Sequence, residues 1–237
     1  MISRLVQYRL VLLVLVLAVF DTLLVVVTQD NRSMPVDLYV ARELQEKRPI
    51  DALVLPIMFA VSLPGYSPWA EMLVVFAVAC GLLRRNWRMA LLIGFTVCAD
   101  ISAALTKVVV ARPRPTSELV TIHGLATGYS FPSGHVVHYV VFFGAIGYLA
   151  WDSAAARRGT VRRALYVVTA CCVAVIGLVG MSRVYLGAHF PTDVLGGYVF
   201  GGIWLLALIA IDRRWLRSRW SQATEAEQGS AQVSARS

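Results

Sequence analysis

The chain has 237 residues, of which 58% are hydrophobic and only 15% are charged, and its mean hydropathy is +0.67. Soluble domains average about 45–50% apolar and roughly 25% charged residues, so the composition excludes disorder, collagen and coiled coil and argues against a soluble globule. The remaining class is a polytopic helical membrane protein. The net charge is +8, and in such a protein this excess marks loops facing anionic lipid rather than nucleic-acid binding.

Six apolar runs approach the length of about 20 residues that a helix needs to cross the bilayer core. They are Leu10–Thr28, Ser67–Leu83, Met89–Ala111, Val136–Trp151, Ala164–Met181 and Pro191–Ile211. The pattern predicts an all-α fold with six transmembrane helices in one domain, residues 1–220. The tail, residues 221–237, is polar and rich in Ser, Gln and Ala, so we expect it to be disordered.

Clusters of arginine predict how the six spans are oriented. They precede the first run, separate the second from the third and the fourth from the fifth, and follow the sixth. The clusters are Arg4 and Arg9; Arg84, Arg85 and Arg88; Arg157, Arg158, Arg162 and Arg163; and Arg213, Arg214, Arg217 and Arg219. With six spans all of them fall on one face, which the positive-inside rule makes cytoplasmic. Both termini are then expected in the cytoplasm, with the protein in the plasma or inner membrane.

The interval 29–66 is expected to hold interfacial helices outside the cytoplasm. Ala52–Leu63 is too short to cross the membrane and is interrupted by Pro56. Counting it as a span would move two arginine clusters to the outer face, so we expect a helix that lies in or dips into the outer interface. Val36–Arg48 carries an apolar stripe, which leaves open a second surface helix or a solvated loop.

Three polar segments fall on the opposite face from the arginine clusters, at similar depth. They are Lys107 with Arg112-Pro113-Arg114-Pro115, then Phe131-Pro132-Ser133-Gly134-His135, then Ser182 through Asp193. Ionisable groups at the membrane level of a helix bundle are rare and commonly mark a functional site.

The cationic members of these segments suit a bound oxyanion. Lys107, Arg114 and Arg183 supply three positive charges, and an arginine fork matches phosphate oxygens. Ser133 and Gly134 have the pattern of a helix start, where a serine N-cap and a close backbone approach would direct free N–H groups at an anion. The predicted site is therefore an oxyanion cradle with no obvious metal ligands.

Two histidines are candidates for the chemistry. A neutral imidazole can attack phosphorus, and a protonated one can donate to a leaving oxygen, which assigns possible roles to His189 and His135. Asp193 follows His189 by one helical turn and could hold the ring proton and fix the tautomer.

The three segments resemble the motifs of the type 2 phosphatidic acid phosphatase family, which shares its core with acid phosphatases and vanadium haloperoxidases. The motifs are K-x-x-x-x-x-x-R-P from Lys107, P-S-G-H from Pro132, and S-R-x-x-x-x-x-H-x-x-x-D from Ser182; all eleven fixed positions are present. They extend over residues 107–193, and residues 29–66 and the tail lie outside the resemblance.

The resemblance implies a phosphatase that works without metal or cofactor on a lipid phosphate. His189 would be the nucleophile that becomes phosphohistidine, Asp193 its orienting partner and His135 the general acid. The implied phosphate-binding set is Lys107, Arg114, Ser133, Gly134 and Arg183. The substrate would be phosphatidate, phosphatidylglycerol phosphate or a polyprenyl diphosphate. Two alternatives remain open: a lipid phosphotransferase that uses the same intermediate, and a non-catalytic phospholipid-binding or transport protein.

Other polar residues carry less weight. For the intramembrane carboxylates Asp21 and Asp100 we expect structural hydrogen bonds rather than catalysis, with Asp100 facing the bundle interior. His138 follows His135 by one turn and either supports the site or only the packing. His123 is expected to be solvated rather than in contact with a headgroup.

Overall fold

The structure of the protein, a computed structural model, describes residues 15–16, 19, 22–23, 25–26, 34–46, 51–124 and 126–216. Within these ranges the secondary structure is entirely helical, as predicted. Twelve of the nineteen residues of the first predicted span, Leu10–Thr28, lie outside the described residues, Asp21 among them, and so does the whole of the predicted disordered tail. The number of six transmembrane helices therefore stays a prediction.

The described helices are, in chain order, α2 (Pro35–Leu44), α3 (Asp51–Ser62), α4 (Trp69–Leu83), α5 (Trp87–Gly94), α6 (Thr96–Val110), α7 (Gly134–His138), α8 (Gly144–Ala155), α9 (Gly159–Tyr185) and α10 (Pro191–Ile211). A short 3-10 turn at Leu63–Gly65 joins α3 to α4. A π-helical turn at Tyr139–Phe143 makes α7 and α8 continuous, and another at Asp212–Leu216 extends α10.

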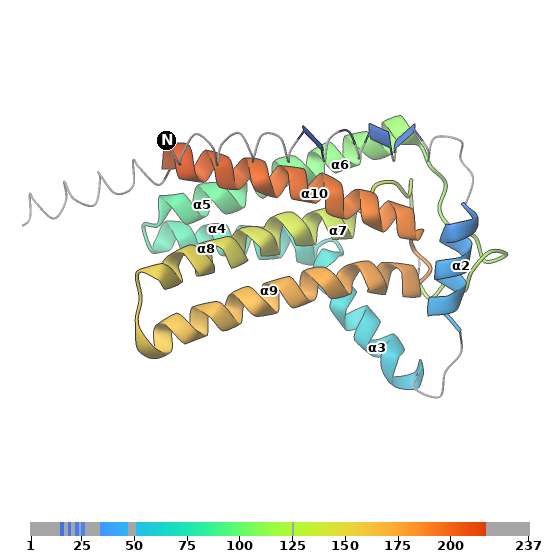
Figure 1. The fold of residues 1–237 in the computed structure, drawn as a ribbon, viewed down its shortest axis with the longest axis horizontal. Helices are drawn as coiled ribbons and strands as arrows, with labels where there is room; N and C mark the ends of the chain where they lie inside the picture. The colour runs from blue at the N-terminus through green and yellow to red at the C-terminus, as the bar shows by residue number, and fades with distance from the viewer. Residues whose placement is uncertain are drawn as a thin grey trace, which may run out of the picture.

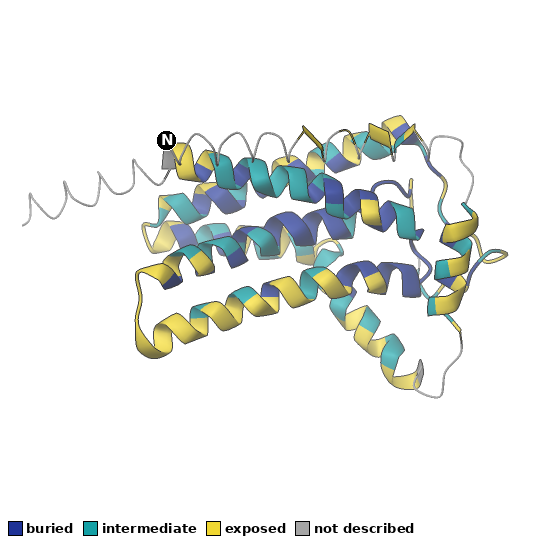
Figure 2. Ribbon diagram, viewed as in Figure 1, coloured by how far each residue is buried: buried dark blue, intermediate teal, exposed yellow. Residues whose placement is uncertain are grey.

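In the described part of the chain, four helical segments are long and apolar enough to cross a membrane: Trp87–Val110, Gly134–Ala155, Gly159–Tyr185 and Pro191–Arg214. These correspond to the third to sixth predicted spans. The third begins two residues earlier and ends one residue earlier than predicted, and the other three extend beyond their predicted bounds at one or both ends. Many apolar side chains of α9 are exposed, and Figure 2 shows this face along most of the helix. Exposed apolar residues of this density suit contact with lipid tails, because soluble proteins rarely expose large apolar patches.

The predicted second span meets the interfacial helix before it at a sharp bend. The segments Ala52–Gly65 and Trp69–Leu83 together are apolar enough to span the membrane, but their axes differ by 54°. The described chain thus has four candidate spans, or five if this bent pair is one span. In Figure 1, α3 diverges from the bundle at the end where α2 lies.

The helices pack around small residues. Where α10 meets the segment before α7, a Cβ on Gly196 would lie 2.3 Å from the ring of Phe131, so only glycine fits there. Small residues are the usual means by which membrane helices approach closely. The close approach brings the start of α10 against the segment that leads into α7.

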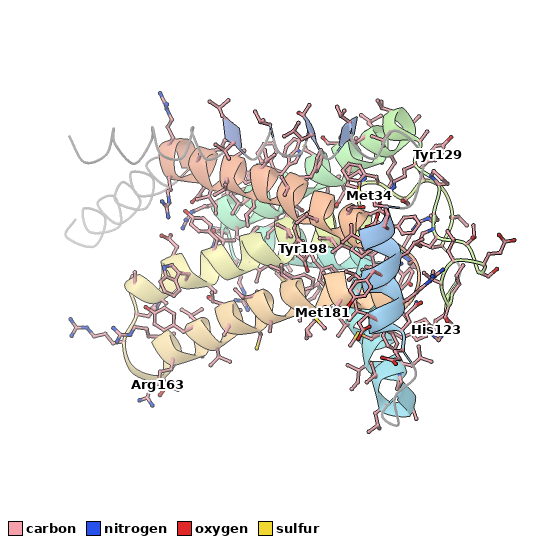
Figure 3. The ribbon with its side chains drawn as sticks, turned by 45° about the vertical axis from the view of Figure 1, so that its right-hand side comes forward. Met34, His123, Tyr129, Arg163, Met181 and Tyr198 are labelled. Atoms are coloured by element: carbon pink, nitrogen blue, oxygen red, sulfur yellow. The ribbon has the colours of Figure 1, made fainter. Side chains whose placement is uncertain are left out.

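The two ends of the bundle differ in chemistry. At one end lie the α4–α5 and α8–α9 connections, and Figure 3 places Arg163 there, far from His123 and Tyr129 at the other. At the arginine-rich end the Arg88 guanidinium donates to Asp212 at 2.7 and 2.8 Å and to Asp152 at 2.7 Å, which ties α5 to α8 and to the end of α10. The motifs of the predicted site all lie at the opposite end.

Candidate functional site

The three motifs meet at the end of the bundle covered by α2. The Lys107 ammonium, on the last turn of α6, donates to the carbonyls of Tyr129 and Ser130 at 3.1 and 3.2 Å. The Ser133 N–H donates to the Asp193 carbonyl at 3.0 Å. The segment between α6 and α7 is therefore bound to both other motifs.

Local sequence explains why α6 ends where the site begins. Ala111 adopts the left-handed conformation with φ 51°, and its N–H bonds to the Lys107 carbonyl at 2.9 Å. Prolines at 113 and 115 cannot continue a helix, so the chain leaves α6 in an extended course. This course leads Arg112 and Arg114 across the end of the bundle toward the start of α10.

Contact with Arg114 fixes the tautomer of His189. One guanidinium nitrogen of Arg114 lies 3.0 Å from Nε2 of His189 and 2.7 Å from the Ala188 carbonyl oxygen. An arginine can only donate hydrogen bonds, so Nε2 must offer its lone pair and the ring proton must sit on Nδ1. The nitrogen that faces the cationic groups is thus the unprotonated one, as a nucleophile requires.

The surroundings of His189 keep its ring neutral. The residue is 2% exposed, and burial lowers the pKa of the imidazole well below its usual range, with the positive charges of Arg114, Lys107 and Arg183 acting in the same direction. Burial and the neighbouring Arg183 also lower the pKa of Arg114, although an arginine stays charged at any ordinary pH.

Asp193 lies beside His189 as the sequence predicts, but without a hydrogen bond to its ring. Its Oδ2 is 3.6 Å from Nδ1 of His189, which is too long for a hydrogen bond, and accepts from the Ser130 hydroxyl at 2.7 Å and the Phe190 N–H at 2.8 Å. That Asp193 holds the ring proton therefore stays a prediction. The carboxylate stands on the Nδ1 side of the ring.

The motifs alone did not reveal Asp37 or Arg112. Arg112 is 1% exposed and donates to Asp193 Oδ1 at 2.5 Å, to the Thr192 hydroxyl at 2.7 Å and to Asp37 Oδ2 at 2.8 Å. Asp37, on α2, is fully buried and also accepts from the Thr192 N–H and hydroxyl at 2.9 and 2.8 Å. Asp193, Arg112 and Asp37 thus form a chain of two buried ion pairs, which links the surroundings of His189 to α2.

Arg183 is buried at the end of α9 and held by the α3–α4 turn. Its guanidinium donates to the Tyr66 hydroxyl at 2.8 Å and to the Ser62 hydroxyl at 3.2 Å. Tyr66 in turn meets the ring of His135 edge-on, with centroids 4.5 Å apart. Sequence reasoning missed Tyr66 and Ser62, because the interval 29–66 matched none of the motifs.

Gly65 permits the approach of this turn to His135. A Cβ at this position would lie 2.5 Å from Cδ2 of the His135 ring and 3.1 Å from the Tyr139 ring. No other residue could stand here without moving the imidazole.

Ser133 stands at the N-cap position of α7, as predicted, but its side chain makes no cap hydrogen bond. Its hydroxyl, Nε2 of His135 and Nε of Arg183 are buried without a partner among the described residues. Buried polar atoms normally find partners. A hydroxyl, an imidazole nitrogen and a guanidinium nitrogen are therefore buried here without protein partners, as expected of groups that bind a polar ligand.

The structure also places Asp100, His138 and His123, to which the motifs assign no role. Nδ1 of His138 lies 3.0 Å from Asp100 Oδ2, so Asp100 makes the internal bond that the sequence predicts. The ring of His123 is partly exposed and stacks on Tyr185 with centroids 5.8 Å apart, so it is solvated on part of its surface only. No three His, Cys, Asp or Glu side chains in the described part of the chain converge in a way that could hold a metal ion.

A membrane-helix bundle with a cationic, histidine-containing cradle at one end defines the class of protein. A sequence model of the PAP2 superfamily matches residues 85–217, and the chain belongs to this superfamily. The fold is similar to that of a PAP2-type phosphatidylglycerolphosphate phosphatase from Bacillus subtilis, with a TM-score of 0.71 over 85% of this chain and 96% of that one, at 23% identity. The recognition of the family from its three motifs is thereby confirmed.

Two curated relatives show where the sequence similarity lies. A lipid A 1-phosphatase of Rhizobium etli is 32% identical over 133 residues, which cover 53% of this chain and 50% of that protein. Phosphatidylglycerophosphatase B of Bacillus subtilis is 36% identical over 93 residues, which cover 39% of this chain and 44% of that protein. The chain thus matches about half the length of these relatives.

Proposed function

We propose that the protein is a lipid phosphatase that hydrolyses a phosphomonoester or diphosphate of a membrane lipid through a phosphohistidine at His189. The contact of Arg114 with Nε2 of His189 carries this proposal, because it identifies Nε2 as the unprotonated ring nitrogen and places it within a cluster of positive charge. When phosphate binds, the Arg114 guanidinium would donate to a phosphoryl oxygen instead and release the lone pair for attack. The names of the relatives, a lipid A 1-phosphatase and a phosphatidylglycerophosphatase, support the reaction class.

In the first step Nε2 of His189 attacks phosphorus, a P–N bond forms and the P–O bond to the lipid breaks. His135 donates a proton to the leaving oxygen, while Asp193 stabilises the positive charge that develops on the His189 ring. In the second step a water molecule attacks the phosphohistidine while His135 accepts its proton, a P–O bond forms, the P–N bond to His189 breaks and inorganic phosphate leaves. The step needs no group beyond the lipid phosphate, water and these side chains.

Lys107, Arg114 and Arg183, with the Ser133 hydroxyl and the N–H groups at Gly134, are proposed to bind the phosphoryl oxygens. The first turn of a helix leaves its N–H groups without internal acceptors, and those of α7 lie beside the unpaired Ser133 hydroxyl. Fixed positive charge at the equatorial oxygens would then supply the stabilisation that metal ions give in many phosphoryl-transfer enzymes.

A cavity next to the cradle supports a lipid as substrate. Its volume is about 540 Å³, within the range of roughly 300–1,000 Å³ typical of small-molecule sites, and it is bounded by α4 and α6 with Lys107 and Gly134 on its wall. Apolar residues such as Val75 and Ile101 line most of the rest. A lipid could place its phosphate at the cradle while its chains follow the apolar wall.

We place the site on the extracytoplasmic side of the plasma or inner membrane, with both termini in the cytoplasm. The arginines at 84–88, 157–163 and 213–214 lie at the end of the bundle away from the cradle. The positive-inside rule makes that end cytoplasmic.

Phosphate release by the purified full-length protein in detergent with EDTA tests the proposal. A panel of phosphatidate, phosphatidylglycerol phosphate and a polyprenyl diphosphate should include a substrate, and His189→Ala should abolish release. Full activity of His189→Ala would contradict the proposal. Lipid binding without turnover by the unmodified protein would favour a binding or transport protein instead.

A further inference from the structure

The turn between α3 and α4 places a tyrosine against the cradle, outside the three motifs. The Arg183 guanidinium donates to the Tyr66 hydroxyl at 2.8 Å, and its central carbon lies 5.1 Å from the centre of the Tyr66 ring. The same ring meets His135 edge-on, with centroids 4.5 Å apart. Tyr66 therefore contacts both a member of the proposed phosphate-binding set and the proposed general acid.

The phenol of Tyr66 also lies within electrostatic reach of Arg114. Burial and the charge of Arg183 lower the pKa of Arg114, whereas Asp193 and Tyr66 act in the opposite direction. Arg114 is the residue whose guanidinium lies 3.0 Å from Nε2 of His189. Tyr66 thus belongs to the surroundings of the candidate nucleophile as well as to those of the general acid.

The Tyr66 hydroxyl carries a proton that is not used within the described structure. A guanidinium can only donate, so the hydroxyl oxygen accepts from Arg183 and its O–H is left to donate elsewhere. Nε2 of His135 is not the acceptor, because that atom is buried without a partner among the described residues. Tyr66 is half-buried, and polar groups away from solvent normally find partners. The spare donor is therefore available to a ligand of the cradle.

Ser62, the other hydroxyl bonded to the same nitrogen of Arg183, has no spare donor. The Ser182 hydroxyl donates to the Val179 carbonyl at 2.7 Å, so in its 2.8 Å contact with Ser62 it can only accept. Ser62 therefore donates to Ser182 and accepts from Arg183 at 3.2 Å, which uses its proton. Of these two hydroxyls, only that of Tyr66 can donate to a ligand.

We infer that Tyr66 is a further phosphate-binding residue, whose hydroxyl donates a hydrogen bond to a phosphoryl oxygen of the substrate. The inference rests on the proposed function, to which it adds a group from outside the three motifs. The hydroxyl can donate to that oxygen while it continues to accept from Arg183. Because the positive charge polarises the O–H bond, this donor is stronger than an isolated tyrosine hydroxyl.

Tyr66→Phe tests the inference, because it keeps the ring and its contacts with Arg183 and His135 but removes the hydroxyl. With the lipid of the panel above that the full-length protein hydrolyses fastest, kcat/KM should fall by about 10- to 100-fold, the effect of one hydrogen bond to a charged group. Ser62→Ala should have a much smaller effect. Tyr39→Phe, which removes an exposed hydroxyl from α2, is the matched control and should change nothing. Unfolding temperatures show whether each variant is folded.

A difluorinated tyrosine in place of Tyr66 separates donation from support of Arg183. Its phenol is a stronger acid, and the phenolate still accepts from Arg183 but can no longer donate. The alkaline limb of kcat/KM should therefore lie at lower pH than in the unmodified protein, measured with the same lipid. A limb that stays in place, or equal losses in Tyr66→Phe and Ser62→Ala, would show that Tyr66 only positions Arg183 and would overturn the inference.

Binding of inorganic phosphate gives a readout that does not depend on turnover. The Kd of phosphate for His189→Ala in detergent, followed by phosphorus NMR, should rise about tenfold when Tyr66→Phe is added. An unchanged Kd would overturn the inference and leave the phosphatase activity in place. If the unmodified protein released phosphate from no lipid of the panel, the proposed function would fail, and the two Kd values would still decide whether Tyr66 binds phosphate.

Discussion

Asp37 and Arg112 form a fully buried ion pair, in which Oδ2 of the carboxylate lies 2.8 Å from the guanidinium nitrogen although the residues are 75 positions apart. The same guanidinium reaches Asp193, beside His189. The surface helix α2 is thus coupled to the candidate nucleophile through one arginine.

Removal of this ion pair should destabilise the protein and weaken the site. In Asp37→Ala, Arg112 retains its ion pair with Asp193 but loses the one with Asp37. Breaking a buried ion pair typically lowers the free energy of unfolding by about 3–5 kcal/mol. We expect a lower unfolding temperature in detergent and a lower kcat for the fraction that remains folded. Glu43→Ala, which removes an exposed carboxylate from the same helix, is the matched control and should change neither. Equal effects of the two substitutions would refute the role of Asp37.

The charge cluster at the opposite end of the bundle should matter for stability alone. Arg88→Ala removes the contacts to Asp152 and Asp212, of which Asp212 is fully buried. Because Arg88 itself is partly exposed, a loss of about 2 kcal/mol is expected, and kcat/KM of the folded protein should stay unchanged. Thermal unfolding and phosphate release measured on the same preparation check both parts. A large loss of kcat/KM in a fully folded sample would show that this end is coupled to the site.

The closeness of Gly65 to His135 predicts a strong effect of a single methyl group. In Gly65→Ala the new Cβ would force the His135 ring to move, and a displacement near 1 Å of a reacting group can cost about 100-fold in rate. We expect a loss of this order in kcat/KM with little change in unfolding temperature. Gly177→Ala, where an added Cβ meets nothing within 4 Å, should be nearly neutral. Unchanged activity of Gly65→Ala would mean that His135 can shift without consequence.

The depressed pKa of His189 predicts a pH dependence. Burial and the charges of Arg114 and Lys107 disfavour the protonated ring, so His189 should remain neutral and nucleophilic below pH 6.5. Lys107→Gln removes one of these charges and should raise the pKa of His189, which moves the acidic limb of kcat/KM to higher pH. Because both proteins are measured with the same lipid, the titration of the substrate phosphate cancels. An acidic limb that stays in place or moves to lower pH would contradict this explanation.

The sequence could predict the site residues that lie within short motifs, because their spacing places them on one helix end or one turn. Lys107, Arg114 and His189 meet at the predicted end of the bundle in this way. The spacing also predicted Asp100 to form an internal bond, although not that His138 would be its partner.

Residues joined only by tertiary packing could not be found in the same way. Asp37 and Tyr66 act through partners more than 70 positions away, and no local pattern connects them. The apolar stripe of α2 did not mark its buried face, because Asp37 and Ala41 are buried in the structure whereas the apolar Val36 and Tyr39 face outward. A carboxylate on the protein-facing side of a helix needs a cationic partner, and Arg112 was the unassigned arginine of the first motif.

The most direct test of the account is to trap the covalent intermediate. Purified protein is mixed with a lipid substrate labelled with ³²P in the phosphate, quenched in alkali to preserve phosphohistidine, and digested for mass spectrometry. The account predicts that the label is found on the peptide that contains His189 and that His189→Ala carries none. In His135→Asn the label should accumulate when the substrate is a lipid diphosphate, which supplies an easily displaced phosphate. Label on another residue, or turnover by His189→Ala at the unmodified rate, would contradict it.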